Sequence, residues 1–150
     1  MAQIVVEIEI PHPIEEVWDD LRQLEQHVEW MADAERMDFL SESTRGVGVA
    51  MAVRTRVGPF ATTDVIEVRE WDELKRIGVS HRGLVSGTGA FLLSPTKRGT
   101  RFVWDEDLTF PWYLGGGVTA QLARPVLRHI WRGNLRRFAA RFDDAATPHP

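Results

Sequence analysis

The stretch that decides the fold is VTAQLARPVLRHIWRGNLRRFAARF, residues 118–142. At 100° per residue its large apolar side chains share one arc, about 140° wide, which is typical of a helix with one buried face. These residues are Leu127, Ile130, Trp131, Leu135, Phe138 and Phe142. So aromatic a face needs a large, curved partner, and we expect the preceding chain to form mainly a β-sheet wrapped around this helix. Pro125 either kinks the helix or marks its start.

A second face of this helix carries Arg128, Arg132 and Arg136, spaced four residues apart. No Asp or Glu occurs between Leu108 and Phe142. Two interpretations fit: a solvated face that pairs with acidic residues elsewhere, or a surface that docks an anionic membrane or a partner. We favour the solvated face.

The totals place the chain among ordinary globular proteins. Its 150 residues predict one domain over 1–144 with a frayed tail at 145–150. A net charge of −4 disfavours nucleic-acid binding, and the absence of cysteine excludes a disulfide framework and a thiol nucleophile. The sequence shows no signal-peptide pattern and no apolar stretch of membrane-spanning length. We therefore expect a cytoplasmic protein without a transmembrane segment, and leave a homodimer open.

The N-terminal third predicts one strand and two short helices. Residues 3–10 alternate apolar and polar side chains, which is typical of a half-buried strand. Pro11 and Pro13 end that strand, and Pro13 suits the start of a helix at Ile14. A second helical piece follows at about residues 24–28.

Closely spaced turn signals then divide the chain into further strands. Such spacing without intervening helices favours antiparallel pairing. The predicted strands are 36–42, 49–57, 61–71, 75–81, 86–94 and 100–110. Which residues of 61–71 face inward is ambiguous from the pattern.

The predicted elements follow the order of the helix-grip layout: one strand, two short helices, six strands and a long helix. Three segments resemble the START-like (SRPBCC) superfamily, especially its bacterial polyketide cyclase/dehydrase-like members: IEIPHPIEEVWDDLRQLEQHVEWM, DVIEVREWDELKRIGVSH and GTRFVWDEDLTF. This resemblance implies an α+β helix-grip fold, with a curved seven-stranded antiparallel sheet around the C-terminal helix. It also implies a deep cavity between sheet and helix that accepts an apolar or aromatic small molecule.

Side chains that face this space are the candidate ligand contacts. Asn134 lies within the apolar arc of the helix, where it either bonds a ligand or satisfies a backbone group. Trp104 and Trp131 either pack the core or form a ligand wall. The full set is Met51, Val53, Phe91, Trp104, Leu108, Trp112, Leu127, Trp131 and Asn134.

Glu106 is the leading candidate for chemistry. It alternates onto the apolar face of the predicted strand 100–110, so its carboxylate points inward. A buried carboxylate without a partner is costly, so it either exchanges a proton as a general acid or base, or lies at a rim or bulge position, or pairs with an arginine.

His81 shares the apolar face of Ile77 and Val79 and ends its strand. In a meander, one strand separates it from Glu106, at roughly 10 Å, so the two would meet only through water or ligand. The alternative, which we favour, is an exposed strand-end histidine beside Arg82.

No other pattern in the sequence predicts a cofactor site. Gly87-Thr88-Gly89 is not a dinucleotide loop because no helix follows it. The five histidines lack metal-ligand spacing, so we expect neither a metal nor an organic cofactor.

The segment 110–117, FPWYLGGG, joins aromatic bulk to three glycines before the long helix. It predicts either a mobile gate over the cavity mouth or a rigid cap against the N-terminal helices.

We therefore rank three functions. The leading one is binding of a hydrophobic small molecule, lipid-like or polycyclic aromatic. The second is cyclisation or dehydration of a polyketide-like substrate, with Glu106 and His81 moving protons. The third is a membrane- or partner-docking module that uses the arginine face.

Overall fold

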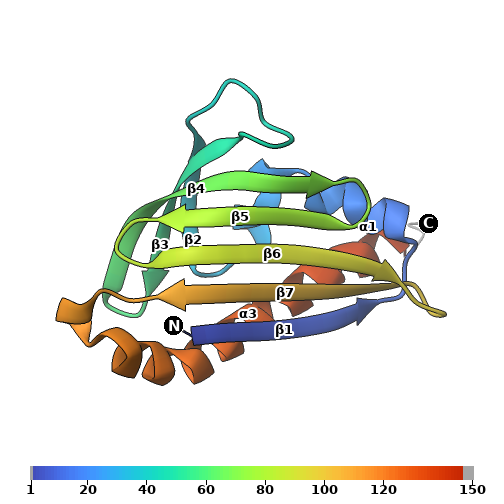
Figure 1. Cartoon of the computed structure of the whole chain (residues 1–150). Coiled ribbons are helices and arrows are strands. Elements are labelled where there is room, and N and C mark those ends of the chain that lie inside the picture. Colours follow the sequence, from blue (N-terminus) through green and yellow to red (C-terminus); the bar gives the residue numbers. More distant parts are fainter. Residues whose placement is uncertain (1, 147–150) are drawn as a thin grey trace.

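A computed structural model describes residues 2–146 of the chain. Seven strands form one antiparallel sheet in the order β1-β7-β6-β5-β4-β3-β2 (Figure 1). Their bounds are β1 Ala2–Ile10, β2 Ala34–Phe39, β3 Ala50–Val57, β4 Phe60–Asp72, β5 Arg76–Arg82, β6 Ser86–Pro95 and β7 Thr100–Thr109. Each lies within a few residues of a predicted strand, and the α+β helix-grip architecture expected from the sequence is confirmed.

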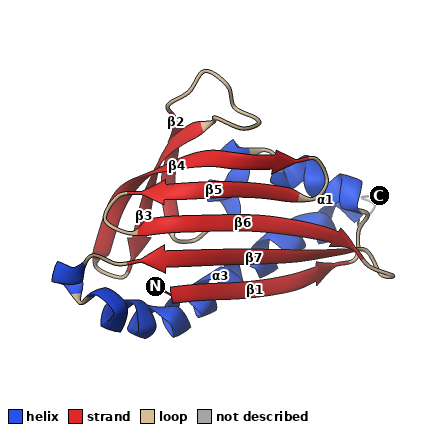
Figure 2. Cartoon of the chain, viewed as in Figure 1, coloured by secondary structure: helices blue, strands red, loops and turns tan. Residues whose placement is uncertain are grey.

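The helices gather on one side of the curved sheet (Figure 2). They are α1 Ile14–Leu21, the 3₁₀ turn η1 Leu24–Gln26, α2 His27–Trp30, a second 3₁₀ turn η2 Trp112–Leu114 and the long α3 Gly116–Ala146. Helix α3 packs mainly along β1. Among residues 2–146, none of the helices combines the length and apolarity needed to cross a bilayer.

Helix α3 has 31 residues and begins before the stretch that predicts it. Pro125 lies inside the helix and so does not mark its start. Because proline has no N–H, the carbonyl of Gln121 loses its helical partner at this point. Of the apolar arc, Trp131, Leu135, Phe138 and Phe142 are buried, as expected. Of the tail expected at 145–150, residues 145 and 146 are helical, and 147–150 lie outside the described residues.

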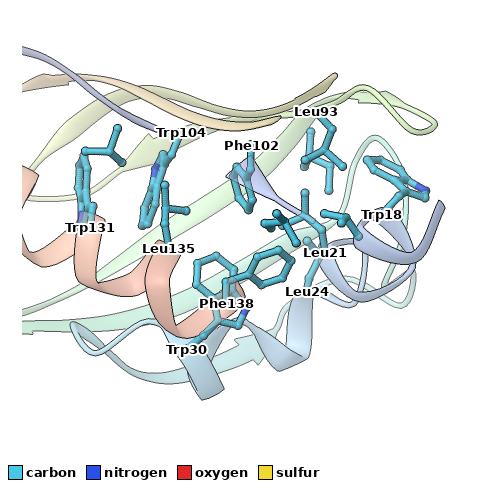
Figure 3. Packing of buried hydrophobic residues seen from close by; sticks show 14 of the residues in the cluster. Trp18, Leu21, Leu24, Trp30, Leu93, Phe102, Trp104, Trp131, Leu135 and Phe138 are labelled. Atoms are coloured by element: carbon cyan, nitrogen blue, oxygen red, sulfur yellow. The ribbon is translucent and has the colours of Figure 1, made fainter. Parts of the chain in front are cut away.

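Aromatic rings fill the part of the core beneath α2. Trp104 from β7 and Trp131 from α3 stack face to face, with ring centroids 4.7 Å apart and planes at 13°. Figure 3 shows this pair beside a second group that includes Trp30, Phe102 and Phe138. Edge-on contacts dominate that second group, which is the favoured geometry for aromatic pairs.

A polar cluster ties the turn before β2 to α3. Asn134 is fully buried, its Oδ1 accepts the backbone N–H of Ala32 at 3.0 Å, and its Nδ2 donates to Oδ1 of Asp33 at 2.8 Å. Nε1 of Trp131 donates to the other oxygen of Asp33 at 3.1 Å. Arg137 also donates to Asn134. Asn134 therefore satisfies a backbone group, which is one of the two roles considered for it.

Replacing Asn134 should destabilise the protein strongly. In Asn134→Ala the N–H of Ala32 and the carboxylate of Asp33 lose buried partners, and we expect the free energy of unfolding to fall by about 2–4 kcal/mol. Urea unfolding measures this. Arg136→Ala, an exposed position two residues along the same helix, is the control and should change it by less than about 0.5 kcal/mol. Equal effects of the two variants would contradict the role of this cluster.

Candidate functional site

The strand register brings two glycines between His81 and Glu106. His81 in β5 pairs with Gly87 in β6, and Gly89 in β6 pairs with Glu106 in β7. On the inner face, the face that α3 covers, β6 therefore has no side chain at either position. The two polar side chains face each other across this gap.

His81 and Glu106 form a direct ion pair, which corrects the expected separation of roughly 10 Å. Nε2 of His81 lies 2.8 Å from Oε2 of Glu106. The physical reason is the missing side chain: a Cβ on Gly89 would lie 2.4 Å from the carboxylate of Glu106. The imidazole spans β6 through space that any other residue at position 89 would fill.

Glu106 points inward, as its alternation predicts, and its side chain is 7% exposed. Its second oxygen, Oε1, accepts the indole N–H of Trp104 at 3.0 Å. Both carboxylate oxygens thus have donors, and the buried charge is paired with histidine rather than with an arginine.

His81 is not the exposed strand-end residue that we favoured, because its side chain is only 16% exposed. Burial lowers its pKa, but the hydrogen bond and charge of Glu106 and the charge of Asp64 outweigh burial, so the pKa is raised above 6.5. Its other ring nitrogen, Nδ1, bonds no group within residues 2–146 and is not sealed from solvent. In its protonated form, His81 therefore holds one free N–H.

His27 shows the opposite behaviour. Burial lowers its pKa to about 4, and its Nε2 bonds the carbonyl oxygen of Leu21 at 2.7 Å. It remains neutral and packs against Trp30 and Phe91. The contrast shows that the carboxylates outweigh burial and raise the pKa of His81.

Asp64 is a polar residue of the inner face that the sequence analysis missed. Its Oδ1 accepts the hydroxyl of Thr62 at 3.2 Å, and its carboxylate covers Gly83, where an added Cβ would lie 1.8 Å from Oδ1. Burial raises the pKa of Asp64, against the opposing effects of Thr62, the backbone N–H of Leu84 and His81. The alternation Thr62, Asp64, Ile66, Val68 is the signal that could have found it, because Val68 is buried.

Apolar side chains flank this polar group. In one row across the sheet, Phe39, Met51 and Ile66 precede His81, and Leu108 and Ala2 follow it. Of the predicted ligand contacts, the buried ones are Met51, Trp104, Leu108 and Trp131, and the partly buried ones are Val53, Phe91 and Leu127. Asn134 belongs to the cluster that ties α3 to the turn before β2. Trp112, in η2, is 86% exposed and does not belong to this group.

Two depressions of the surface lie outside the space between sheet and helix. One, of about 410 Å³, lies between the β1–α1 and β6–β7 connections. The other, of about 340 Å³, lies on the outer face of the sheet, and its lining includes Gly78 and Ala90. Within residues 2–146, no group of three histidine or carboxylate side chains is placed to hold a metal ion.

The segment 110–117 lies at the opposite end of the sheet from α1. It follows the last residue of β7, whereas α1 follows Ile10 of β1, which pairs with the first residue of β7. Gly115 and Gly116 adopt φ of 95° and 49°, which favour glycine. This placement removes the basis for a rigid cap against the N-terminal helices and leaves the gate as a prediction.

The arginine face of α3 is solvated at two of its three positions. Arg132 and Arg136 are exposed and Arg128 is half-buried, and none of them forms an ion pair within the described part of the chain. A docking role for this face remains a prediction.

A curved antiparallel sheet that grips one long helix, with a polar group on its inner face, defines a START-like helix-grip protein. The chain belongs to the family described as polyketide cyclase/dehydrase and lipid transport, whose match spans residues 1–146. A comparison with curated protein sequences finds no significant match.

Solved structures show the same fold at low identity. TTHA0849 from Thermus thermophilus is 19% identical, with a TM-score of 0.82 over 97% of this chain and 99% of that one. The di-domain aromatase/cyclase StfQ of the steffimycin biosynthetic pathway is 16% identical, with a TM-score of 0.78 over 97% of this chain and 51% of StfQ. The Zhui aromatase/cyclase from Streptomyces sp. R1128 is 12% identical, with a TM-score of 0.74 over 97% and 95%.

The ion pair predicts a pH dependence of stability. Because the pKa of His81 is raised in the folded protein, its contribution is fully present below the unfolded value of about 6.5 and is lost as the pH rises through the folded value. Glu106→Gln removes the main cause of the shift. We expect the wild type to exceed this variant in unfolding free energy by more at about pH 5.5 than at about pH 9. Urea unfolding at both pH values measures this.

NMR titration of the His81 ring supplies the direct test. The pKa of His81 should fall in Glu106→Gln, and also in Gly89→Ala, whose methyl group pushes the carboxylate away. Gly133→Ala is the matched control, because the nearest atom to its Cβ is 3.6 Å away. An unchanged His81 pKa in both site variants would show that the pair does not form in solution.

Proposed function

We propose that this protein binds a hydrophobic small molecule, lipid-like or polycyclic aromatic, against the inner face of the sheet beside the first half of α3. The observation that carries this proposal is the pair of His81 and Glu106, held at 2.8 Å among apolar side chains with one imidazole N–H left unpaired. Such a surface offers apolar contact and one hydrogen-bond donor, the composition typical of small-molecule sites.

A purely structural role explains the pair less well. Taking two charges out of water costs several kcal/mol per ion, and well-packed apolar residues of similar volume often give equal or greater stability. The core here is already rich in aromatic packing beside the pair. A buried, charged pair that leaves a donor free therefore favours a role in recognition.

In this proposal the inner space opens at the end near η2, since the two depressions described above lie elsewhere. The first half of α3 and η2 are suited to such a movement because they expose large apolar side chains that make few contacts. These side chains are Trp112, Tyr113, Leu114, Val118 and Leu122. We propose that residues 110–117, with their three glycines, act as the gate.

Two comparisons support a ligand of this kind. The description of the family covers both lipid transport and polyketide cyclisation or dehydration. Two proteins with the same fold, StfQ and Zhui, are named as aromatase/cyclases. At 16% and 12% identity they support the fold, and their activity enters only as a hypothesis for this chain.

The second candidate function is cyclisation or dehydration of a polyketide-like substrate. The free N–H of His81 favours it, because an imidazolium can give its proton to the oxygen of a carbonyl that is attacked. Glu106 would orient the imidazole and stabilise its charge, as the buried carboxylate does in catalytic triads. Asp64 would accept the proton that the attacking carbon loses, and its raised pKa suits that role.

Native mass spectrometry tests the binding function. Freshly purified protein should carry an apolar molecule of defined mass, or take up added 2-acetylnaphthalene in a 1:1 complex. In the loaded state, amide hydrogen exchange over 110–117 should slow because the gate closes. Protein that shows only the polypeptide mass, and binds no apolar probe, would overturn the proposal.

Glu106→Gln separates a binder from an enzyme, because glutamine keeps the shape and removes the charge that supports the imidazolium. Under catalysis, the variant should still bind a synthetic poly-β-ketone but convert it at least about 100-fold more slowly, as measured by mass spectrometry of the cyclised products. Asp107→Asn, on the outer face of the same strand, is the control and should leave conversion unchanged. Conversion at the spontaneous rate by the wild type would leave binding as the function.

A further inference from the structure

The inner rows of the described strands carry more acidic than basic side chains. His81 is the one basic side chain on the inner rows of the described strands, and it faces two carboxylates, Glu106 on β7 and Asp64 on β4. The next inner positions in the same row of the sheet are apolar, with Ile66 and Met51 on one side and Leu108 on the other.

The arginines within residues 2–146 do not bond His81, Glu106 or Asp64. Most of them pair on the outer face or at the helices: Arg54 and Arg56 with Glu35, Arg82 with Glu67, Arg141 with Asp20 and Arg137 with the carbonyl of Trp30. Arg124 lies on the inward side of α3, where its Nη1 donates to Oε1 of Gln121 at 3.2 Å and its Nε is buried without a partner. The charged side chains that act on His81 are therefore both acidic, Glu106 and Asp64.

We infer that the polar end of the ligand is an uncharged oxygen acceptor, such as a ketone or ester carbonyl, bound by Nδ1 of His81, and that molecules ending in a carboxylate or phosphate are rejected. This inference rests on the proposed function and narrows it, because it separates neutral oxygenated molecules from fatty acids and phospholipids.

Electrostatics gives the reason. Glu106 already compensates the charge of His81 at 2.8 Å. An anion at Nδ1 would add a third negative charge beside Asp64 and Glu106 in surroundings of low polarity, where like charges repel strongly. A carbonyl oxygen takes the same N–H and adds no net charge, so the donor is satisfied without repulsion. Selection against the charged analogue is specificity by an unfavourable interaction.

Matched probes test this by isothermal titration calorimetry at neutral pH. The aromatic arm compares 2-acetylnaphthalene, 2-naphthoic acid and 2-ethylnaphthalene. The aliphatic arm compares 2-dodecanone with dodecanoic acid. Within each arm the apolar body is held nearly constant, so differences in affinity report the polar end. A comparison of the two ketones shows whether the site prefers a polycyclic or a linear body.

Each ketone should bind at least about tenfold more tightly than its acid, and 2-acetylnaphthalene about fivefold more tightly than 2-ethylnaphthalene. An acid that binds as well as or better than its ketone would overturn the inference while leaving the proposed function intact. Failure of all five probes to bind would overturn the proposed function itself.

A pair of charge-neutralising variants on one strand provides the second test. Asp64→Asn keeps the shape of the side chain and removes a negative charge beside His81, so the affinity for 2-naphthoic acid should rise and that for the ketone should stay within about twofold. Glu67→Gln, on the outer face of β4, is the control and should leave both affinities unchanged. An acid affinity that is the same in wild type and Asp64→Asn would contradict the electrostatic argument.

Discussion

The stack of Trp104 on Trp131 is the contact on which the rest of the structure depends. It joins the sheet to α3, and each indole N–H ends on a carboxylate. Trp104 donates to Glu106, which holds His81, and Trp131 donates to Asp33, which anchors Asn134 and the turn before β2. One aromatic contact thus positions both the candidate site and the tie between helix and sheet. A shift of α3 along its axis would disturb both carboxylates together.

The candidate site depends equally on side chains that are absent. Glycine within a strand weakens the strand, because it gives up packing and costs conformational entropy. Strand β6 nevertheless places Gly87 and Gly89 where its neighbours present His81, Leu108 and Glu106. The cost is offset by a contact that crosses a whole strand. In the sequence the same glycines resemble a fragment of a nucleotide-binding loop. In the fold they leave the space through which the two polar side chains meet.

The order of the elements, the number of strands and the inward direction of Glu106 could be predicted from the sequence. Each strand shows its own alternation of apolar and polar residues, with a period of two. The contact between His81 and Glu106 could not be predicted, because it depends on the register of three strands and on the reach of an imidazole over glycine. Asp64 was missed because the strand that carries it has apolar or small residues on both faces around Val65. The alternation of apolar and polar residues along one strand shows on which face of the sheet a side chain lies. Its neighbours on that face are known only once the pairing of the strands is known.

The two halves of the space between sheet and helix differ in how tightly they are packed. This difference favours a binding role for the polar pair over a purely structural one. Beneath α2, rings at centroid distances of 4.9–6.4 Å leave little room, and the close packing resists deformation. Beside the first half of α3, Val53, Ile66, His81 and Leu127 remain partly exposed, and Pro125 interrupts the hydrogen bonds of the helix. Movement of α3 relative to the sheet therefore costs the least free energy where the polar pair faces the partly exposed side chains. In the proposed function, the aromatic half would hold Glu106 in place through Trp104 while the other half opens, so a ligand would enter without dismantling the polar pair.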